Sequence, residues 1–137
     1  MNGLTLKKLQ DLGAQDWTKG RSNKLATFLN EYSDLPIVAF NAKYDRDDVL
    51  GSAFDKVGNI LNLPDKGRWR CTYKLSYRIP NLETRHLDDV LRSLEIEPRK
   101  GGEYHDAITD ATLSGFAYMK LIKMPDLDKP KLGFCKK

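Results

Sequence analysis

A short apolar run at residues 37–40, Ile-Val-Ala-Phe, constrains the fold of this chain more than any other feature. It follows the turn sequence Ser33-Asp34-Leu35-Pro36 and ends at the polar residue Asn41. A run this short, bounded by turn signals and rich in β-branched residues, predicts a buried strand. Residues 68–72 are a second candidate strand. Because the surrounding pattern is helical, the sequence predicts an α/β fold.

Helical periodicity accounts for most of the remaining chain. Apolar spacing predicts helices at about residues 5–12, 20–32, 45–62, 73–78, 84–95 and 105–123. The second of these has an apolar stripe formed by Leu25, Phe28, Leu29 and Tyr32. The residues expected on the buried face of the last helix are Ile108, Ala111, Thr112, Gly115, Phe116, Met119 and Ile122. Two strands are too few for the sheet that these helices should cover, and the shortage points to the N-terminus.

Composition is that of one soluble globular domain. The chain has 137 residues, of which 40% are hydrophobic and 31% charged. We expect a partial domain at residues 1–124 and a basic tail at 125–137. No stretch approaches the roughly 18 apolar residues of a membrane span, and the N-terminus does not resemble a signal peptide. Cys71 and Cys135 form no CxxC pair and fit a reducing compartment, so we expect a cytoplasmic protein. The net charge of +4 is compatible with a polyanionic partner.

Polar residues directly follow the first predicted strand. Asp45 lies just beyond its carboxyl end, where open α/β sheets usually place their ligands. The alternative is that Asp45 caps the helix that follows, because aspartate is a favourable N-cap residue. Taken alone, this segment favours the cap.

A second polar cluster opens the last predicted helix. If that helix starts near Asp106, His105 lies at its N-terminus and Asp110 follows about one turn later. Asp110 has the small neighbours Ala107, Ala111 and Ser114, which would let the helix approach a sheet closely. A carboxylate on such a face is costly to bury unless a cation or donor meets it, which favours a metal site at Asp110. The alternatives are that His105 or Asp106 only starts the helix and that Asp110 is an exposed polar residue.

Four short motifs follow one another along the chain: Gly3-Leu4-Thr5, Asn-Ala-x-Tyr-Asp at 41–45, Cys71-Thr72, and His-Asp-Ala-x-x-Asp-Ala at 105–111. Their order resembles that of the DnaQ-like, or DEDDh, 3′→5′ exonucleases. This family includes the proofreading ε subunit of bacterial DNA polymerase III and several RNA-trimming enzymes. The resemblance covers roughly residues 3–122. It implies a ribonuclease H-like mixed β-sheet flanked by helices, and removal of nucleotides from DNA or RNA 3′ ends.

The resemblance also implies roles for individual residues. Asp110 corresponds to a direct metal ligand, Asp45 to a carboxylate that helps orient the metals through water, and His105 to the general base. The segment Gly3-Leu4-Thr5 corresponds to one that packs against the terminal nucleotide, and the second motif adds Asn41 and Tyr44 to the substrate-binding residues. The implied cofactors are two Mg²⁺ or Mn²⁺ ions about 4 Å apart, which can stabilise the entering and leaving oxygens of an in-line displacement.

One family motif is missing from its expected place. In these exonucleases an Asp-x-Glu motif on the opening strand precedes the Gly-Leu-Thr segment, whereas here Met1 and Asn2 stand before Gly3. Asp11 and Asp16 lie in a helix-turn region and are poor substitutes. We therefore expect an N-terminally truncated fold with an incomplete metal site that is inactive as an isolated chain. Phe40 is a smaller departure, because many members have a histidine there.

Three functional hypotheses follow. The chain is an exonuclease domain that is active when complete, a degenerate domain that binds nucleic acid or a polymerase without cutting, or an unrelated small α/β interaction protein. The expected partners are single-stranded 3′ ends and, as a further candidate, a DNA polymerase subunit, with no membrane. The basic residues expected near the cleft are Lys43, Arg46, Arg68 and Arg70.

Overall fold

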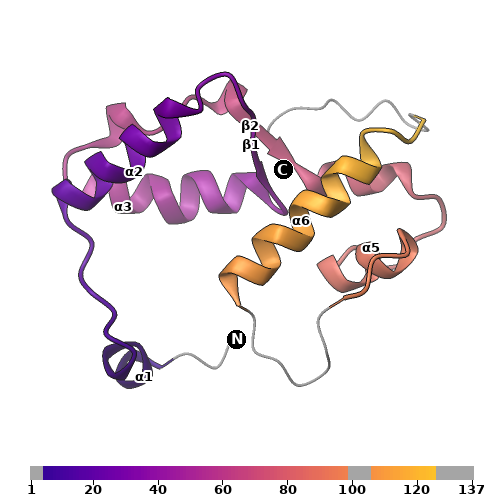
Figure 1. Cartoon of the computed structure of the whole chain (residues 1–137), viewed down its shortest axis with the longest axis horizontal. Coiled ribbons are helices and arrows are strands. Elements are labelled where there is room, and N and C mark those ends of the chain that lie inside the picture. Colours follow the sequence, from indigo (N-terminus) through magenta and orange to yellow (C-terminus); the bar gives the residue numbers. More distant parts are fainter. Residues whose placement is uncertain (1–4, 99–105, 126–137) are drawn as a thin grey trace.

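The structure is a computed structural model that describes residues 5–98 and 106–125. It is rich in helix and contains a small two-stranded parallel sheet (Figure 1). The α-helices are α1 (Leu6–Asp11), α2 (Lys19–Glu31), α3 (Ser52–Lys56), α4 (Thr72–Leu75), α5 (Leu87–Ser93) and α6 (Ala107–Leu121). The strands are β1 (Ile37–Ala39) and β2 (Trp69–Cys71), and the other helical segments are η1 (Tyr44–Gly51), η2 (Ile60–Asn62), η3 (Lys66–Arg68) and η4 (Ser76–Arg78).

Both predicted strands are present, and they pair in parallel. Ile37 is opposite Trp69, and Ala39 is opposite Cys71. The α/β class is therefore compatible with the structure, whereas the ribonuclease H-like arrangement remains a prediction. The residues of β1 are only partly buried, not fully buried as the apolar run suggested. A two-stranded parallel sheet is unusual, because parallel strands normally lie inside larger sheets that are covered on both faces.

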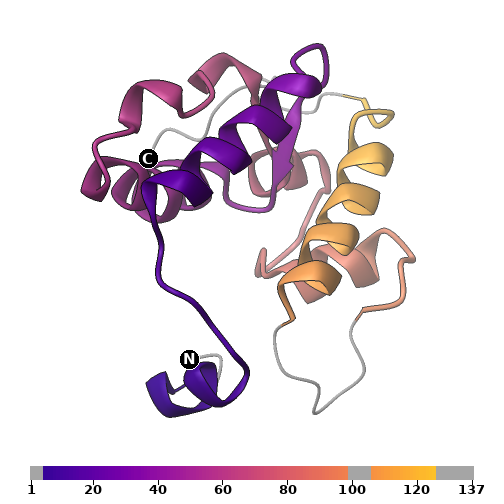
Figure 2. The same cartoon turned by 60° about the vertical axis from the view of Figure 1, so that its left-hand side comes forward.

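The N-terminal helices begin and end where local chemistry favours it. Thr5 caps α1 by accepting a hydrogen bond from the backbone N–H of Lys8 at 3.1 Å, and Thr18 caps α2 in the same way. Gly13 follows α1 with a φ of +75°, a conformation that favours glycine. An extended segment then joins α1 to α2, so that α1 lies apart from the other helices in both views (Figures 1 and 2).

The helix predicted at residues 45–62 is interrupted. A π-helical segment, η1, runs directly into α3, and the helix ends before Gly58, whose φ is +64°. The turn η2 follows as a separate element. Gly58 explains the early end, because a left-handed residue cannot continue a right-handed helix.

Small core clusters hold the elements together. One lies between α2, α3 and η2, where Phe54 is fully buried against Ala26 and Leu63. Another joins α4, η4, α5 and α6 through buried residues, namely Leu75, Ile79, Val90, Leu91, Leu94, Ala117 and Leu121. The buried residues of α2 are Ser22 and Ala26, so the predicted stripe is wrong in part, because Phe28 and Tyr32 are exposed.

Helix α6 packs against β1 and crosses the sheet (Figure 1). The prediction for its buried face is wrong. Its buried residues are Ser114, Ala117 and Leu121. The large apolar residues expected inside are exposed, namely Ile108, Phe116, Met119 and Ile122. The small side chains Ser114 and Ala117 face the protein and allow a close approach to β1 and α4, and these four large side chains are left without cover in the described part of the chain.

Two further expectations concern the cell compartment. Within residues 5–98 and 106–125, no helix combines the length and the apolar character needed to cross a bilayer. Cys71, buried at the end of β2, is disulfide-bonded, which does not support the expectation of reduced cysteines.

Candidate metal and nucleic-acid site

A large cavity lies beyond the carboxyl end of β1. Its volume is about 1340 Å³, and it is lined by residues of α1, β1, α5 and α6 and by the segment that follows β1. Asn41, Asp45 and Asp110 all line it. The structure therefore brings the second and fourth sequence motifs together, although they are far apart in the chain.

Asp45 reaches this cavity from the first turn of the helical segment after β1. Its backbone N–H donates to the carbonyl of Asn41 at 3.2 Å. The residue before η1 is Lys43, which makes no side-chain cap, and Asp45 is the second residue inside the helix. The interpretation of Asp45 as an N-cap residue is therefore wrong, and the residue lines the cavity from inside the helix.

Asp110 is held from the opposite wall by α6. Asp106 caps this helix by accepting hydrogen bonds from the backbone N–H of Thr109 at 2.9 Å and from its hydroxyl at 2.7 Å. One oxygen of the Asp110 carboxyl group is buried. The hydroxyl of Ser114 donates to the carbonyl of Asp110 at 2.7 Å, and the buried Thr72 hydroxyl donates to the carbonyl of Ser114 at 3.3 Å. Thr72 of the third motif thus helps to fix the distance between α6 and the sheet.

Two aspartates of the cavity have shifted pKa values, and the two shifts are in opposite directions. Burial raises the pKa of Asp45 above its ordinary value and outweighs the backbone hydrogen bonds from Asp45 and Asn41, which lower it. The hydrogen bonds from Thr109 lower the pKa of the exposed Asp106. The helix cap therefore stabilises the charged form of Asp106, whereas the surroundings of Asp45 disfavour its charged form. A bound cation would relieve that cost.

The sequence patterns missed several residues of the cavity. His86 and the acidic residues Asp88 and Asp89 line it at the start of α5, together with Arg92. Lys8 lines it from α1. A lone histidine before a short amphipathic helix carries no recognisable pattern, so only the spatial arrangement identifies His86 as part of this wall.

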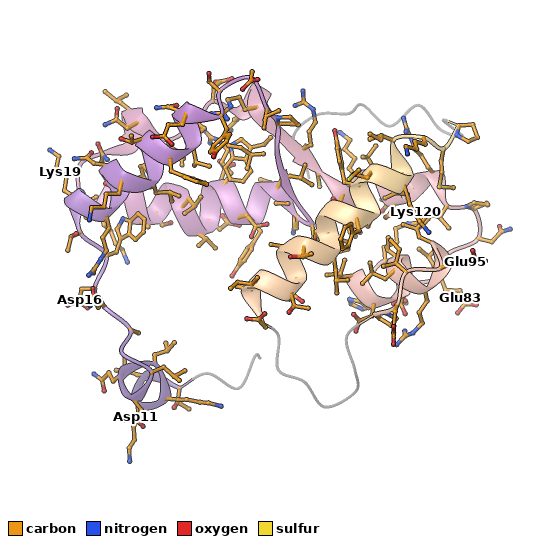
Figure 3. All side chains as sticks on the ribbon, in the orientation of Figure 1. Asp11, Asp16, Lys19, Glu83, Glu95 and Lys120 are labelled. Carbon is orange, nitrogen blue, oxygen red and sulfur yellow. The ribbon has the colours of Figure 1, made fainter. Side chains whose placement is uncertain are left out.

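The structure does not bring all predicted site residues to the cavity. Tyr44 is exposed and Thr5 caps α1, and neither lines it. Gly3, Leu4 and His105 lie outside the described residues. Figure 3 places Asp11 on α1 and Asp16 on the extended segment, both away from α6, and neither lines the cavity.

The basic residues predicted near the cleft lie elsewhere. Arg46 pairs with Asp47 at 2.7 Å and donates to the carbonyl of Pro64. Arg68 donates to the carbonyls of Tyr32 and Leu35, and Arg70 donates to that of Gly67. These arginines link segments of the chain through hydrogen bonds to backbone carbonyl groups. Neither they nor Lys43 line the cavity.

The residues of the cavity fit a divalent cation in kind but not in number. Carboxylate oxygens such as those of Asp45 and Asp110 are the ligands that Mg²⁺ and Mn²⁺ prefer. Within the described ranges, however, no group of three or more His, Cys, Asp or Glu side chains is arranged to hold a metal ion. The cavity therefore offers part of a ligand set.

Comparisons with known proteins add no relative. No protein-family model matches the chain, and neither the curated proteins nor the solved structures contain a match.

Proposed function

We propose that this chain is a metal-dependent 3′→5′ exonuclease domain whose described residues supply part of the metal site. The observation that carries the proposal is the meeting of Asp45 and Asp110 in one cavity at the carboxyl end of β1. The sequence motifs that contain these residues resemble those of DnaQ-like exonucleases, and they are far apart in the sequence. An unrelated interaction protein would have no reason to place both carboxylates in the same cavity.

The electrostatics of the cavity support a cation and a phosphate. Asp45 and Asp110 would hold divalent ions, which supply stabilisation of the charge that develops on the scissile phosphate. Lys8 and Arg92 line the same cavity and bring positive charge to its other walls. Arg92 is tethered to Asp89 at 3.3 Å, so its guanidinium is held beside the cavity. Such groups contact phosphates, which supply most of the sequence-independent affinity for nucleic acid.

The proposal assigns the remaining metal ligands to an Asp-x-Glu strand that adds to the sheet beside β1. In the described residues β1 pairs with β2 alone, and its other edge has no strand partner there. His105 is assigned as the general base on the sequence resemblance alone, because it lies outside the described residues. The attacking water would lose its proton to this imidazole, whose ordinary pKa suits that task.

A trimming assay tests this proposal. The isolated chain should not shorten an oligonucleotide from its 3′ end, because its set of metal ligands is incomplete. A fusion that places a short β-hairpin bearing Asp-x-Glu before Gly3 should shorten a 5′-labelled oligonucleotide in Mg²⁺ or Mn²⁺. In that fusion His105→Ala should lower the rate strongly and leave metal binding largely intact.

Matched substitutions exclude a contaminant. Asp110→Asn in the fusion should abolish trimming, whereas Asp55→Asn should not, because Asp55 lies on α3 outside the cavity. Robust trimming by the unmodified chain that Asp110→Asn abolishes would overturn the argument from missing ligands. Trimming that survives Asp110→Asn would reject the site.

A second candidate function is a degenerate domain that binds nucleic acid or a polymerase subunit without cutting. The incomplete ligand set of the described residues favours it. It predicts that the fusion folds and binds single strands but never trims them, whatever the divalent ion. The same assay therefore separates the two candidates.

A further inference from the structure

A row of aromatic rings runs from the wall of the cavity to the protein surface. The rings of Phe40 and Tyr73 are 5.9 Å apart between centroids, and those of Tyr73 and Tyr77 are 5.8 Å apart. Both pairs meet edge to face, at 82° and 83°. The guanidinium carbon of Arg85 lies 4.2 Å from the centroid of the Tyr77 ring. The row thus has an apolar end at Phe40 and a cationic end at Arg85.

One end of this row lies on the wall of the cavity, and the other end is next in sequence to a residue of that wall. Phe40 lines the cavity, and its carbonyl accepts a hydrogen bond from the backbone N–H of Tyr73 at 2.8 Å. Arg85 is followed directly by His86, which lines the cavity again. A strand of nucleic acid with its end in the cavity would therefore meet these rings as it leaves.

The row is fixed in place and still open to solvent. The Tyr73 and Tyr77 hydroxyls lie 3.4 Å apart, and Arg85 donates to the carbonyl of Ser76 at 3.2 Å. Tyr73 is 37% exposed and Tyr77 is 44% exposed. Exposed aromatic surface costs free energy in water, and nothing in the described residues covers it. The hydrogen bond with the Tyr77 hydroxyl raises the pKa of Tyr73.

We propose that Tyr73, Tyr77 and Arg85 form a stacking platform for the bases of a single strand whose 3′ end lies in the cavity. This inference rests on the proposed function. Base stacking on aromatic side chains is tolerant of sequence, and a nearby arginine adds cation–π and phosphate contacts. The platform binds the nucleotides behind the terminal one, so it determines how strongly a single strand is held and takes no part in cleavage.

A matched aromatic pair elsewhere supplies the control. Phe28 and Tyr32 on α2 also meet edge to face, with centroids 5.3 Å apart, and they are 55% and 48% exposed. Neither residue lines the cavity. Removing these two rings takes away a similar amount of exposed aromatic surface and leaves the platform unchanged.

The test is fluorescence anisotropy with the whole chain and a labelled single-stranded oligonucleotide in EDTA. Tyr73→Leu/Tyr77→Leu should weaken binding at least about fivefold, and Phe28→Leu/Tyr32→Leu should leave it within about twofold. Tyr73→Phe/Tyr77→Phe keeps the rings and should retain the affinity. On the unaltered chain, an oligonucleotide with abasic sites behind its 3′ nucleotide should bind as weakly as the normal one binds to the leucine variant.

Equal losses from both leucine pairs, or equal binding of the normal and abasic oligonucleotides, would overturn the platform. The abasic comparison uses the unaltered protein, so it decides the matter even if the leucine variant does not fold. EDTA removes any cleavage from the measurement. A fusion that fails to trim would therefore reject the exonuclease proposal and leave this result standing, and a fusion that trims without base-dependent affinity would reject the platform alone.

Discussion

Two regions of this molecule, the closed half and the open half, differ in how their polar groups are accommodated. The closed half comprises α2, α3 and η2, and the open half comprises the cavity and the elements around it, α1, β1, α5 and α6. In the closed half, buried Asn59 donates to Ser22 at 2.6 Å and to Asn23 at 2.9 Å, beside the fully buried Phe54. In the open half, Asp45 carries a raised pKa, and α6 exposes its largest apolar residues.

The difference lies in the surroundings of the buried polar groups. In the closed half these groups have partners inside the protein. In the open half carboxylates gather at the end of a two-stranded sheet, and the surroundings of Asp45 disfavour its charge. Under the proposed function, a cation would offset that cost.

The largest expected difference between the halves is in packing. Phe54→Ala should lower the free energy of unfolding by about 3–5 kcal/mol, because the ring is fully buried. Phe116→Ala should change it by only about 0.5 kcal/mol, because that side chain is 54% exposed. Urea denaturation followed by tryptophan fluorescence measures both. A large loss from Phe116→Ala would show that the outer face of α6 is covered in solution, and the comparison would break.

Removing a buried polar side chain from the closed half should destabilise the protein, in contrast to removing the charge of Asp45 from the open half. Asn59→Ala should lower the free energy of unfolding by about 1–3 kcal/mol, because it leaves buried partners without their hydrogen bonds. Asn30 is exposed on α2, so Asn30→Ala is the control and should change the free energy of unfolding very little. Thermal melts followed by circular dichroism are sufficient. An equal effect at both positions would show that the closed half does not depend on its polar network.

Asp45→Asn should stabilise the protein slightly at neutral pH, which is the smallest of these effects. A raised pKa means that the folded protein binds the proton of Asp45 more tightly than the unfolded chain does. The protonated carboxyl group therefore favours folding below its ordinary pKa, and this contribution is lost as pH rises through the folded pKa. Melting temperatures of the two proteins should converge as pH falls. A constant gap across that range would contradict burial as the cause.

Local sequence signals predicted the elements but not how they face one another. Thr5 and Gly13 bracket α1, and the run at 37–40 gives β1, because caps, turns and periodicity act within a few residues. The face of α6 could not be predicted in the same way. Both sides of this helix are apolar, and the close approach of small residues such as Ser114 and Ala117 decided which side is buried.

The candidate site was predictable only in part. Asp45 and Asp110 were found because each lies in a recognisable motif, and both line the cavity. His86, Arg92 and Lys8 carry no motif and enter the site through the packing of α5 and the position of α1. Such residues are visible only in three dimensions.

Manganese binding shows whether Asp45 and Asp110 form part of a metal site. Titration calorimetry of the isolated chain should give dissociation constants on the order of millimolar or weaker. The fusion that carries Asp-x-Glu before Gly3 should bind two Mn²⁺ ions much more tightly, and Asp110→Asn should remove that gain. Submillimolar binding of two ions by the chain alone, or a fusion whose affinity ignores Asp110→Asn, would contradict the account.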